Sequence, residues 1–473
     1  MRHARPVRVR QQVQFLRRQF AQDSRLPFSE VLTEDLVTKT LEALSIIWVD
    51  RIYSPLVTLW VFLSQVLSAD HSCRGAVSRL IAHRLGHGQT PCSPKTGAYC
   101  QARERLPEQF FSTLACSVGR ELDDKAEHHW RWKGRRVYLF DGTTVDLPDT
   151  PENQNAYPQV YNQKPGLGFP IARFGAIISL ACGAILNLGV CRYAGKGQGE
   201  VSLLRQLWHI LRRGDILLTD RLQANWANIV FLRERGLELV SRLNKAHRTA
   251  DFRRGIRLGH QDHIVRWNKP TSIRSLDWQT YRRLPEFIMI RETKIRVVQR
   301  GFRTRSIVIV TTLLDHLKTT KEDLATLYRA RWNNELDLRT IKSTMQMHQL
   351  RCKTPELVRK EIWTHALAYN LIRTLMAQAA STHGILPRTI SFKGTMQALE
   401  AFQPAIEQGV GPDSARRLLL YEELLATIAS HRVADRPDRI EPRAKKKRRD
   451  HYAWLTIPRW KFKCRMAKGF NAI

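Results

Sequence analysis

Residues 324–347 read LATLYRARWNNELDLRTIKSTMQM, a stretch with neither glycine nor proline. Its apolar residues recur at three- and four-residue steps, which is the pattern of one amphipathic helix. Tyr328, Arg331, Glu335 and Lys342 lie at offsets of zero, three, seven and fourteen residues. In an α-helix of ~3.6 residues per turn, these offsets fall within an arc of about 60°. We therefore expect one helix face that carries an acid between two cations and a phenol.

Such a face suits phosphate chemistry. A carboxylate can bind a divalent metal ion, and arginine and lysine bind phosphate oxygens. The alternative interpretation is a solvated helix face held by salt bridges, which is a common use of mixed charges. Further acids elsewhere in the chain, placed so that they can join Glu335, would favour the metal-binding interpretation.

The composition indicates a folded protein with a polyanionic partner. The 473 residues are 43% hydrophobic, which is enough for a large core, and the length suggests two to four domains. Lysine and arginine number 77 against 43 aspartate and glutamate, so the formal net charge is +34 and the pI is near 10.5. Nucleic acid is the partner that best fits this surplus.

Cysteine and hydropathy patterns exclude other classes. The eight cysteines contain no CxxC pair, which argues against a zinc ribbon or a disulfide scaffold and favours reduced thiols in a cytoplasmic protein. His83 and His87 lie four residues apart, but no second ligand pair follows, so we expect a solvated or capping role. Residues 54–67 are too few to span a membrane, and residues 174–190 are interrupted and rich in strand formers. We expect no transmembrane segment.

The first 130 residues are expected to be mostly helical. The first 22 residues carry many arginines and no acid, which suits a basic arm on DNA. Helical periodicity covers residues 58–67, 74–85 and 93–105. Two short helices around a tight turn are compatible with a helix-turn-helix that places one helix in a major groove. The outward side chains would then be Lys95, Gln101, Arg103 and Arg105. Helices that only pack together are the alternative.

Two acids follow predicted strands. Residues 136–140 form an apolar run that ends at Asp141 and is followed by a Gly-Thr-Thr turn, and residues 216–219 form a strand that ends at Asp220. Strands at 171–180 and 184–193 and a helix at 200–211 are expected between them. Acids at the carboxyl ends of neighbouring strands point into the crevice where α/β sheets bind ligands. Asp141 and Asp220 are thus the partners expected for Glu335.

The remaining elements complete a mixed sheet. A helix at 226–234 and a strand at 237–240 come next, and short alternating runs at 244–305 predict a β-rich insertion before a strand at 306–312. A long helix at 355–378 is expected to pack Trp363, Leu367, Leu371 and Leu375 into the core. Residues 442–449 form a cationic run, which is either a solvated stretch or a phosphate clamp.

The three acids favour a metal-dependent reaction. Clustered carboxylates raise each other's pKa unless a cation lies between them. Oxygen ligands without His or Cys favour Mg²⁺ or Mn²⁺, and two such ions ~3.5–4 Å apart can activate a water or a 3′-hydroxyl and stabilise the leaving oxygen of a phosphodiester. Asp146, Asp149 and Asp215 are expected to be caps or turn residues, and Glu200 a helix-opening acid favoured by the helix dipole.

The spacing Tyr-x2-Arg-x3-Glu-x6-Lys resembles the signature helix of DDE transposases of the IS4 family, with Asn334 in place of the usual apolar residue before the acid. The resemblance covers roughly residues 136–373 and implies a ribonuclease H-like core. It implies metal binding by Asp141, Asp220 and Glu335 and a grip on transposon-end phosphates by Tyr328, Arg331 and Lys342. Arg339 joins that helical face by geometry.

The resemblance also implies how such a protein works. It implies cut-and-paste transposition, in which a homodimer pairs both inverted-repeat ends of double-stranded DNA, cleaves them with Mg²⁺ (two ions, for which Mn²⁺ can substitute) and joins them to target DNA. A DNA hairpin can form on the way, and in relatives a tryptophan ahead of the insertion's last strand stacks on a flipped base. Residues 304–307 contain no tryptophan. Trp267 and Trp278, which lie earlier in the insertion, either take that stacking role or are packing residues.

The expected fold class is α/β, and its parts follow in order along the chain. We expect a helical DNA-binding region at 1–130, a ribonuclease H-like mixed sheet core at 131–243 and 306–385, a β-rich insertion at 244–305, and a helical region with a basic tail at 386–473. The expected location is the prokaryotic nucleoid in the cytoplasm. Two alternative functions remain open, namely a non-catalytic repressor derived from a transposase and a nuclease on the same core.

Overall fold

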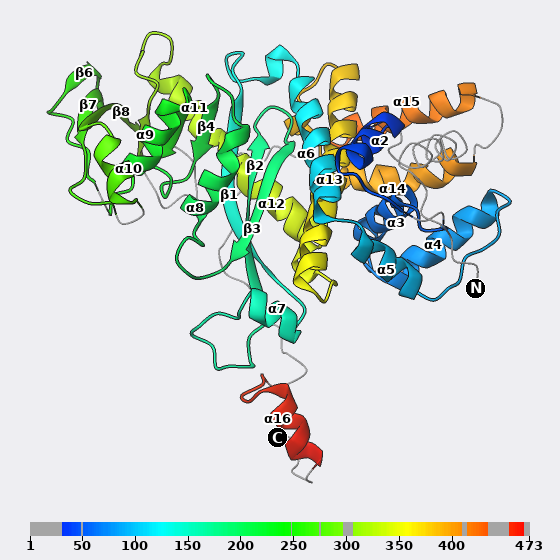
Figure 1. Ribbon diagram of the computed structural model, residues 1–473. Helices are drawn as coiled ribbons and strands as arrows, with labels where there is room; N and C mark the ends of the chain where they lie inside the picture. Colours follow the sequence, from blue (N-terminus) through cyan, green and yellow to red (C-terminus); the bar gives the residue numbers. More distant parts are fainter. Residues whose placement is uncertain are drawn as a thin grey trace. The chain divides into compact units, whose positions relative to one another are not determined.

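The computed structural model describes residues 31–48, 51–246, 248–273, 276–296, 306–408, 414–433 and 454–467 (Figure 1). The basic arm expected in the first 22 residues, the cationic run at 442–449 and residues 304–305 of the 304–307 neighbourhood lie outside these ranges.

The chain divides into two compact units. The first, here called the helical unit, comprises Met1–Tyr138, Ala176–Leu188 and Asn333–Val433. The second, here called the sheet unit, comprises Leu139–Gly175, Gly189–Trp332 and Ala434–Ile473.

Helices account for most of the helical unit. Before the sheet it contains α2 (Glu34–Ala43), α3 (Pro55–Leu67), α4 (Cys73–Gly86), α5 (Gly97–Arg105), α6 (Glu108–Asp124) and the short 3-10 turn η1 (His128–Trp130). After the sheet come α13 (Pro355–Thr382), η5 (Pro387–Thr389), α14 (Phe392–Gln408) and α15 (Ser414–Ser430). The helices expected at 58–67 and 74–85 correspond to α3 and α4, whereas the one expected from residue 93 begins at Gly97.

Helix α13 is the centre of the helical unit and packs on α3, α6, α14 and α15. It starts where Thr354 accepts a hydrogen bond from the Leu357 amide and Pro355 takes the first turn. Its expected core residues Trp363, Leu367, Leu371 and Leu375 are all buried, as predicted.

One polar side chain inside that core joins α13 to two other elements. The Asn370 amide donates to the carbonyls of Ala115 in α6 and Ile185 in strand β3, at 2.8 Å each, and accepts from the Ile185 amide at 2.8 Å. A Cβ on Gly119 would lie 2.0 Å from the Ile185 oxygen, so only glycine lets α6 approach the strand this closely.

The strands form one mixed sheet of nine, in the order β3-β2-β1-β4-β5-β9-β8-β7-β6. Their bounds are β1 Val137–Asp146, β2 Ile171–Ser179, β3 Ile185–Arg192, β4 Ile216–Thr219, β5 Glu238–Arg242, β6 Ile256–Gly259, β7 Asp262–Asn268, β8 Phe287–Arg296 and β9 Ser306–Thr311. Strand β4 pairs with β5 in parallel, while β5-β9, β9-β8, β8-β7 and β7-β6 are antiparallel. The α/β class is therefore confirmed.

Two helices expected between the sheet strands are present, namely α8 (Glu200–Leu207) with the turn η2 (Trp208–Ile210) and α9 (Trp226–Glu234). Two short helices, α7 (Pro151–Ala156) and α10 (Trp278–Arg283), were not expected. The insertion differs from expectation in one respect, since its strands β6, β7 and β8 continue the main sheet through β9. A further helix, α16 (Arg459–Ala467), lies near the end of the described chain.

The expectation that β1 ends at Asp141 was wrong. The strand runs on to Asp146, so Asp141 lies in its middle. Thr143, Thr144 and Val145 are β-branched and fit an extended strand, and this preference outweighs the turn tendency of Gly142.

The single helix expected at 324–347 is divided. Helix α11 (Lys321–Ala330) begins with a capping box of Thr320 and Asp323, and α12 (Trp332–Arg339) follows after Arg331. From Thr340 the chain winds into a π-helical turn, η3 (Thr340–Thr344), which the Met345 amide closes on the Thr340 carbonyl at 2.9 Å, and a 3-10 turn η4 (Met347–Gln349) comes next. Because π turns are wider than α turns, the expected 60° arc does not extend to Lys342.

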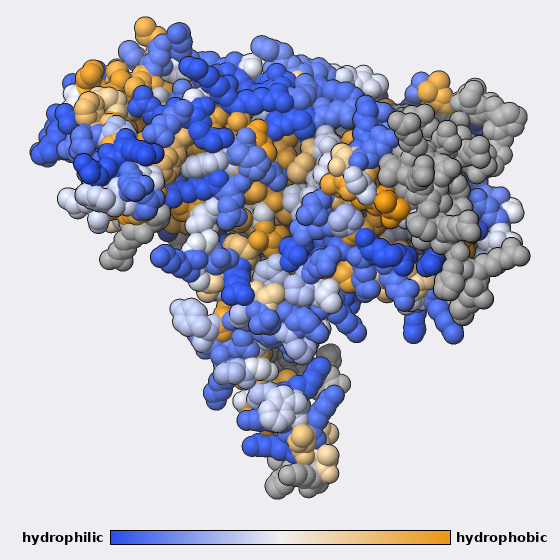
Figure 2. All heavy atoms as spheres, viewed as in Figure 1, coloured by the Kyte–Doolittle hydropathy of each residue, from blue (hydrophilic) through white to orange (hydrophobic). Residues whose placement is uncertain are grey.

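In the described part of the chain, no helix is long and apolar enough to cross a membrane. Hydrophilic side chains cover most of the face seen in Figure 2, coloured blue, with apolar groups between them.

Candidate active site

Asp141 and Asp220 lie on neighbouring strands of the sheet unit. Asp141 is in the middle of β1, and Asp220 directly follows β4, which is next to β1 in the sheet. Asp141 accepts a hydrogen bond from the Gly142 amide at 2.8 Å, and Asp220 accepts one from the Leu222 amide at 2.9 Å. The two carboxylates are close enough for their charges to interact.

A third carboxylate, Glu200, joins them from the start of α8. A Cβ on Gly142 would lie 2.9 Å from Glu200 Cγ and 3.2 Å from Glu200 Oε1, so the Glu200 side chain lies directly against the residue after Asp141. The sequence suggested only a helix-opening acid here, because the helix dipole favours such a residue whatever lies nearby. A glycine beside Asp141, which leaves room for another side chain, was the available signal.

Neighbouring charges disfavour the ionisation of Asp141 and Glu200. Burial raises the pKa of Asp141 to about 6, and the negative charges of Glu200 and Asp220 add to the rise, while the Gly142 amide and Arg331 oppose it. The pKa of Glu200 is also raised, by burial first and then by Asp220, against the opposing charge of Arg173. Added positive charge beside these acids would favour their ionised forms.

Tyr328 and Arg331 lie beside the two aspartates within the sheet unit. Arg331 caps the end of α11, and its guanidinium carbon lies 5.9 Å from the centre of the Tyr328 ring. Burial raises the pKa of Tyr328, and Asp220 raises it further while Arg331 and Arg242 oppose the rise. The structure thus brings together Asp141, Asp220, Tyr328 and Arg331 among the residues named from the sequence.

The other three named residues belong to the helical unit. Glu335 and Arg339 lie in α12 and Lys342 lies in η3; Arg339 is exposed, whereas Glu335 and Lys342 are partly buried. Their proximity to Asp141 and Asp220 stays a prediction. Asn334, the unusual residue before Glu335, is 1% exposed and neither polar atom of its amide has a hydrogen-bond partner in the described chain.

A buried ionic network fixes the rotation of α12. Asp337, two residues after Glu335, is 1% exposed and accepts bonds from Arg373 at 2.5 Å, from Arg388 at 2.7 and 2.8 Å, and from the Tyr369 hydroxyl at 3.0 Å. Buried charges require such pairing. The network keeps Asp337 inside the helical unit, while its neighbour Leu336 is 41% exposed.

One expected residue role is wrong, and for Trp267 the structure selects packing, which was one of its two expected roles. Arg103, expected to face a DNA groove, is 4% exposed, although Lys95, Gln101 and Arg105 are exposed. Trp267 is 3% exposed and donates its indole N–H to Glu292 at 2.8 Å, so it is a packing residue.

Trp278 differs from Trp267, because it is 67% exposed and stacks on Tyr281 with ring centres 5.7 Å apart. The Trp278 ring is therefore accessible for stacking on a DNA base. Asp215 was expected to be a turn residue. The structure confirms this, because its carboxylate accepts a hydrogen bond from the Arg212 amide at 2.7 Å.

The chemistry of the donors fits a divalent cation of the Mg²⁺ or Mn²⁺ kind. The sheet unit presents three carboxylates whose burial and mutual repulsion a cation would relieve, and all their ligand atoms are oxygen. In the described residues, no three His, Cys, Asp or Glu side chains are already arranged to hold an ion together.

Comparisons with known proteins identify the family. Residues 132–371 match the family model described as the transposase DDE domain. The chain is 28% identical over 375 residues to transposase InsG for insertion sequence element IS4 from Escherichia coli (strain K12), covering 74% of this chain and 76% of that protein. A piggyBac transposase, solved as a synaptic complex with hairpin DNA, is similar at a TM-score of 0.42 and 10% identity, over 90% of this chain and 88% of that one. The chain belongs to the DDE transposases, and within them to the IS4 family.

Proposed function

We propose that this transposase binds the inverted-repeat ends of an insertion sequence and catalyses Mg²⁺-dependent DNA strand cleavage and strand transfer. The observation that carries the proposal is the carboxylate cluster of Asp141, Asp220 and Glu200 beside Tyr328 and Arg331. The strand order β3-β2-β1-β4-β5, with acids on the adjacent strands β1 and β4, supports a ribonuclease H-like core.

In this proposal Asp141, Asp220 and Glu335 hold two Mg²⁺ ions, with Glu200 adding negative charge next to them. Bound ions of this kind activate a water or a 3′-hydroxyl and stabilise the leaving oxygen of a phosphodiester.

The cations and the phenol act on the DNA. The charge of Arg331 acts on Asp141, so a phosphate bound to its guanidinium would be held near the carboxylates. Tyr328 stays protonated at neutral pH, because its pKa is raised, and can donate its hydroxyl to a phosphate oxygen. We propose that Lys342 and Arg339 bind further phosphates along the same DNA strand.

DNA is the partner that the charge supports. A formal charge of +34 favours binding along several phosphates of a duplex. We propose a homodimer that pairs two transposon ends with target DNA in the cytoplasm.

The test is a cleavage and joining assay. Purified protein is incubated with labelled end duplexes, a target plasmid and either Mg²⁺ or EDTA. We expect Mg²⁺-dependent nicks at the ends and end-plasmid products, and neither product from Asp141→Ala, Asp220→Ala or Glu335→Ala variants that still bind the duplex. Cleavage without joining would identify a nuclease. Binding without cleavage in the unaltered chain would identify a repressor.

A further inference from the structure

The helical unit buries an arginine, Arg103, that forms no ion pair within the described part of the chain. Arg103 in α5 is 4% exposed, and its guanidinium carbon lies 4.5 Å from the centre of the Tyr99 ring and 4.9 Å from that of Phe62. Its Nη1 donates to Gln65 Oε1 at 3.4 Å. Arginine stays protonated in proteins, and a buried charge without a counter-ion is costly. Among the described residues, no carboxylate lies within ion-pairing distance of this guanidinium.

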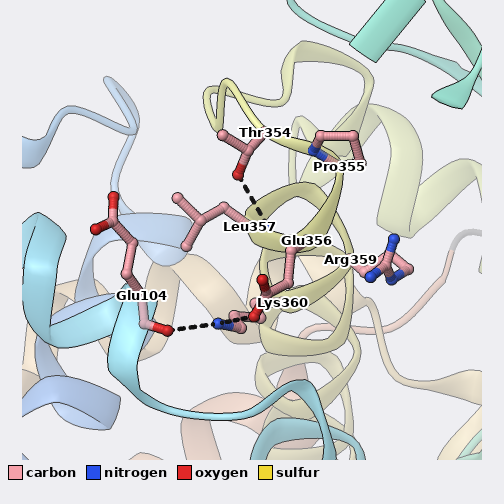
Figure 3. A pocket seen from close by; sticks show the side chains of 7 residues that line it. All are labelled: Glu104, Thr354, Pro355, Glu356, Leu357, Arg359 and Lys360. Atoms are coloured by element: carbon pink, nitrogen blue, oxygen red, sulfur yellow. Dashed lines mark hydrogen bonds and ion pairs between the residues drawn. The ribbon is translucent and has the colours of Figure 1, made fainter. Parts of the chain in front are cut away.

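Arg103 cannot easily leave this environment, because α5 is held onto α13. The Lys360 ammonium of α13 donates to the carbonyls of Arg103 at 3.3 Å and Glu104 at 3.0 Å, and pairs with Glu356 at 2.6 Å. Figure 3 shows Lys360 and Glu356 directed towards the end of α5 in a pocket that Glu104 also lines. The guanidinium therefore needs its counter-ion inside the unit.

Three sulfur atoms surround the guanidinium. Nη2 lies 3.4 Å from the Sγ atoms of both Cys73 and Cys100, and Nη1 lies 3.7 Å from Cys352 Sγ. These thiols come from α4, α5 and the segment before α13. All three cysteines are free thiols. The buried Glu361 carboxylate, which accepts from the Arg351 and Cys352 amides, also interacts electrostatically with Arg103, although it forms no ion pair with it. Among the groups in direct contact with the guanidinium, a thiolate is the anion that can form.

Cys100 is the thiol best placed to ionise. Its polar contact with Cys73, and then the charge and hydrogen bond of Arg103, lower the pKa of Cys100 to about 5 despite partial burial. The same contact raises the pKa of Cys73, whose thiol donates a hydrogen bond to Gln65 Oε1 at 3.8 Å. Burial raises the pKa of Cys352. The pair therefore holds one proton at neutral pH, on Cys73.

We propose that Cys100 and Cys73 form a peroxide-reactive thiol pair, in which Cys100 is the nucleophile and Cys73 the resolving thiol. The Cys100 thiolate attacks one oxygen of hydrogen peroxide, the O–O bond breaks, and Cys100 sulfenic acid and hydroxide form. The Cys73 sulfur then displaces the sulfenic oxygen, which leaves as water, and a Cys73–Cys100 disulfide forms. Peroxide is reduced and the two thiols are oxidised by two electrons.

Alkylation of the unaltered protein tests the thiolate. The rate of iodoacetamide labelling of each cysteine is measured by mass spectrometry from pH 4 to pH 9. For Cys100 we expect a rise centred near pH 5 and a plateau above pH 7, because the thiolate is the reactive form. A Cys100 rate that still rises about tenfold per pH unit between pH 6 and pH 8 would overturn the proposal.

Peroxide treatment tests the pair. After hydrogen peroxide, digestion of the unaltered chain should give peptides that join residues 73 and 100. The Cys73→Ser variant should accumulate a sulfenic acid at Cys100, trapped by dimedone, and Cys100→Ser should show neither product. Cys116→Ser, which alters a partly buried thiol in α6, should behave as the unaltered chain. A disulfide from Cys100 to another cysteine, or none, would refute the pairing.

Discussion

Replacing Asp141 by Asn should stabilise the metal-free protein, because the native carboxylate is forced to ionise in an unfavourable place. The change keeps the shape and an oxygen that can accept from the Gly142 amide, but removes the charge beside Glu200 and Asp220. The pKa of Asp141 is about 6 in the fold against 3.8 for an ordinary aspartate, and each pKa unit corresponds to about 1.4 kcal/mol, so ionisation costs the fold about 3 kcal/mol.

The sign of the effect depends on pH. With a raised pKa the folded state binds its proton more tightly than the unfolded chain, so this contribution to stability is complete below pH 3.8 and is lost as the pH rises through about 6. The Asp141→Asn variant does not lose this stability as the pH rises, because asparagine has no proton to release in this range. The difference in free energy of unfolding between variant and native protein should be about 0.5 kcal/mol at pH 4 and reach about 3 kcal/mol above pH 7.

Urea unfolding in EDTA, followed by tryptophan fluorescence from pH 4 to pH 8, measures this difference. Asp146→Asn is the matched control, because Asp146 ends the same strand and is exposed. Adding Mg²⁺ should stabilise the native protein and not the Asp141→Asn variant, since a bound ion stabilises only a fold that holds it. If the variant is no more stable than the native protein at pH 8, Asp141 does not lie in a crowded carboxylate cluster and the reasoning fails.

Three other substitutions separate the remaining roles. Glu200→Gln should move the acid limb of the cleavage pH profile to lower pH, because the loss of a neighbouring charge lowers the pKa of Asp141. The control Glu152→Gln changes an exposed acid and should leave the profile unchanged. If the Glu200→Gln profile equals that of the native protein, Glu200 does not belong to the site. Arg331→Ala should lower the salt dependence of end binding by about one unit in a log-log plot, and an unchanged slope would mean that Arg331 contacts no phosphate. Trp278→Ala should reduce hairpin formation on end duplexes without slowing the first nick, a result that equal hairpin yields would contradict.

The sequence alone predicted the structure correctly where the local pattern and the tertiary environment favour the same element. Strand β4 and helix α9 have the bounds that hydropathy and turn residues predicted, and Asp220 directly follows β4 as expected. The core face of α13 was also predictable, because a long apolar stripe at helical spacing has few other uses.

Other features depend on contacts that no local pattern contains. The sequence Gly142-Thr143-Thr144 suits both a turn and a strand, and pairing within the sheet selects the strand. Glu200 has the local signature of a helix cap and Arg103 that of an exposed helix residue, yet packing brings one to Asp141 and the other to three thiols. Hydrophobic periodicity assumes one regular helix. It therefore could not predict that the signature helix is interrupted at Arg331 or that a π turn follows.

The central claim is that Asp141, Asp220 and Glu335 share divalent metal ions. It is tested most directly by replacing Mg²⁺ with Fe²⁺ in the complex with an end duplex and generating hydroxyl radicals with ascorbate and peroxide, which cut the polypeptide next to the ion. We expect fragments that end near residues 141, 220 and 335, suppressed by excess Mg²⁺ and absent in Asp220→Ala. Cuts near 141 and 220 without any near 335 would contradict the claim.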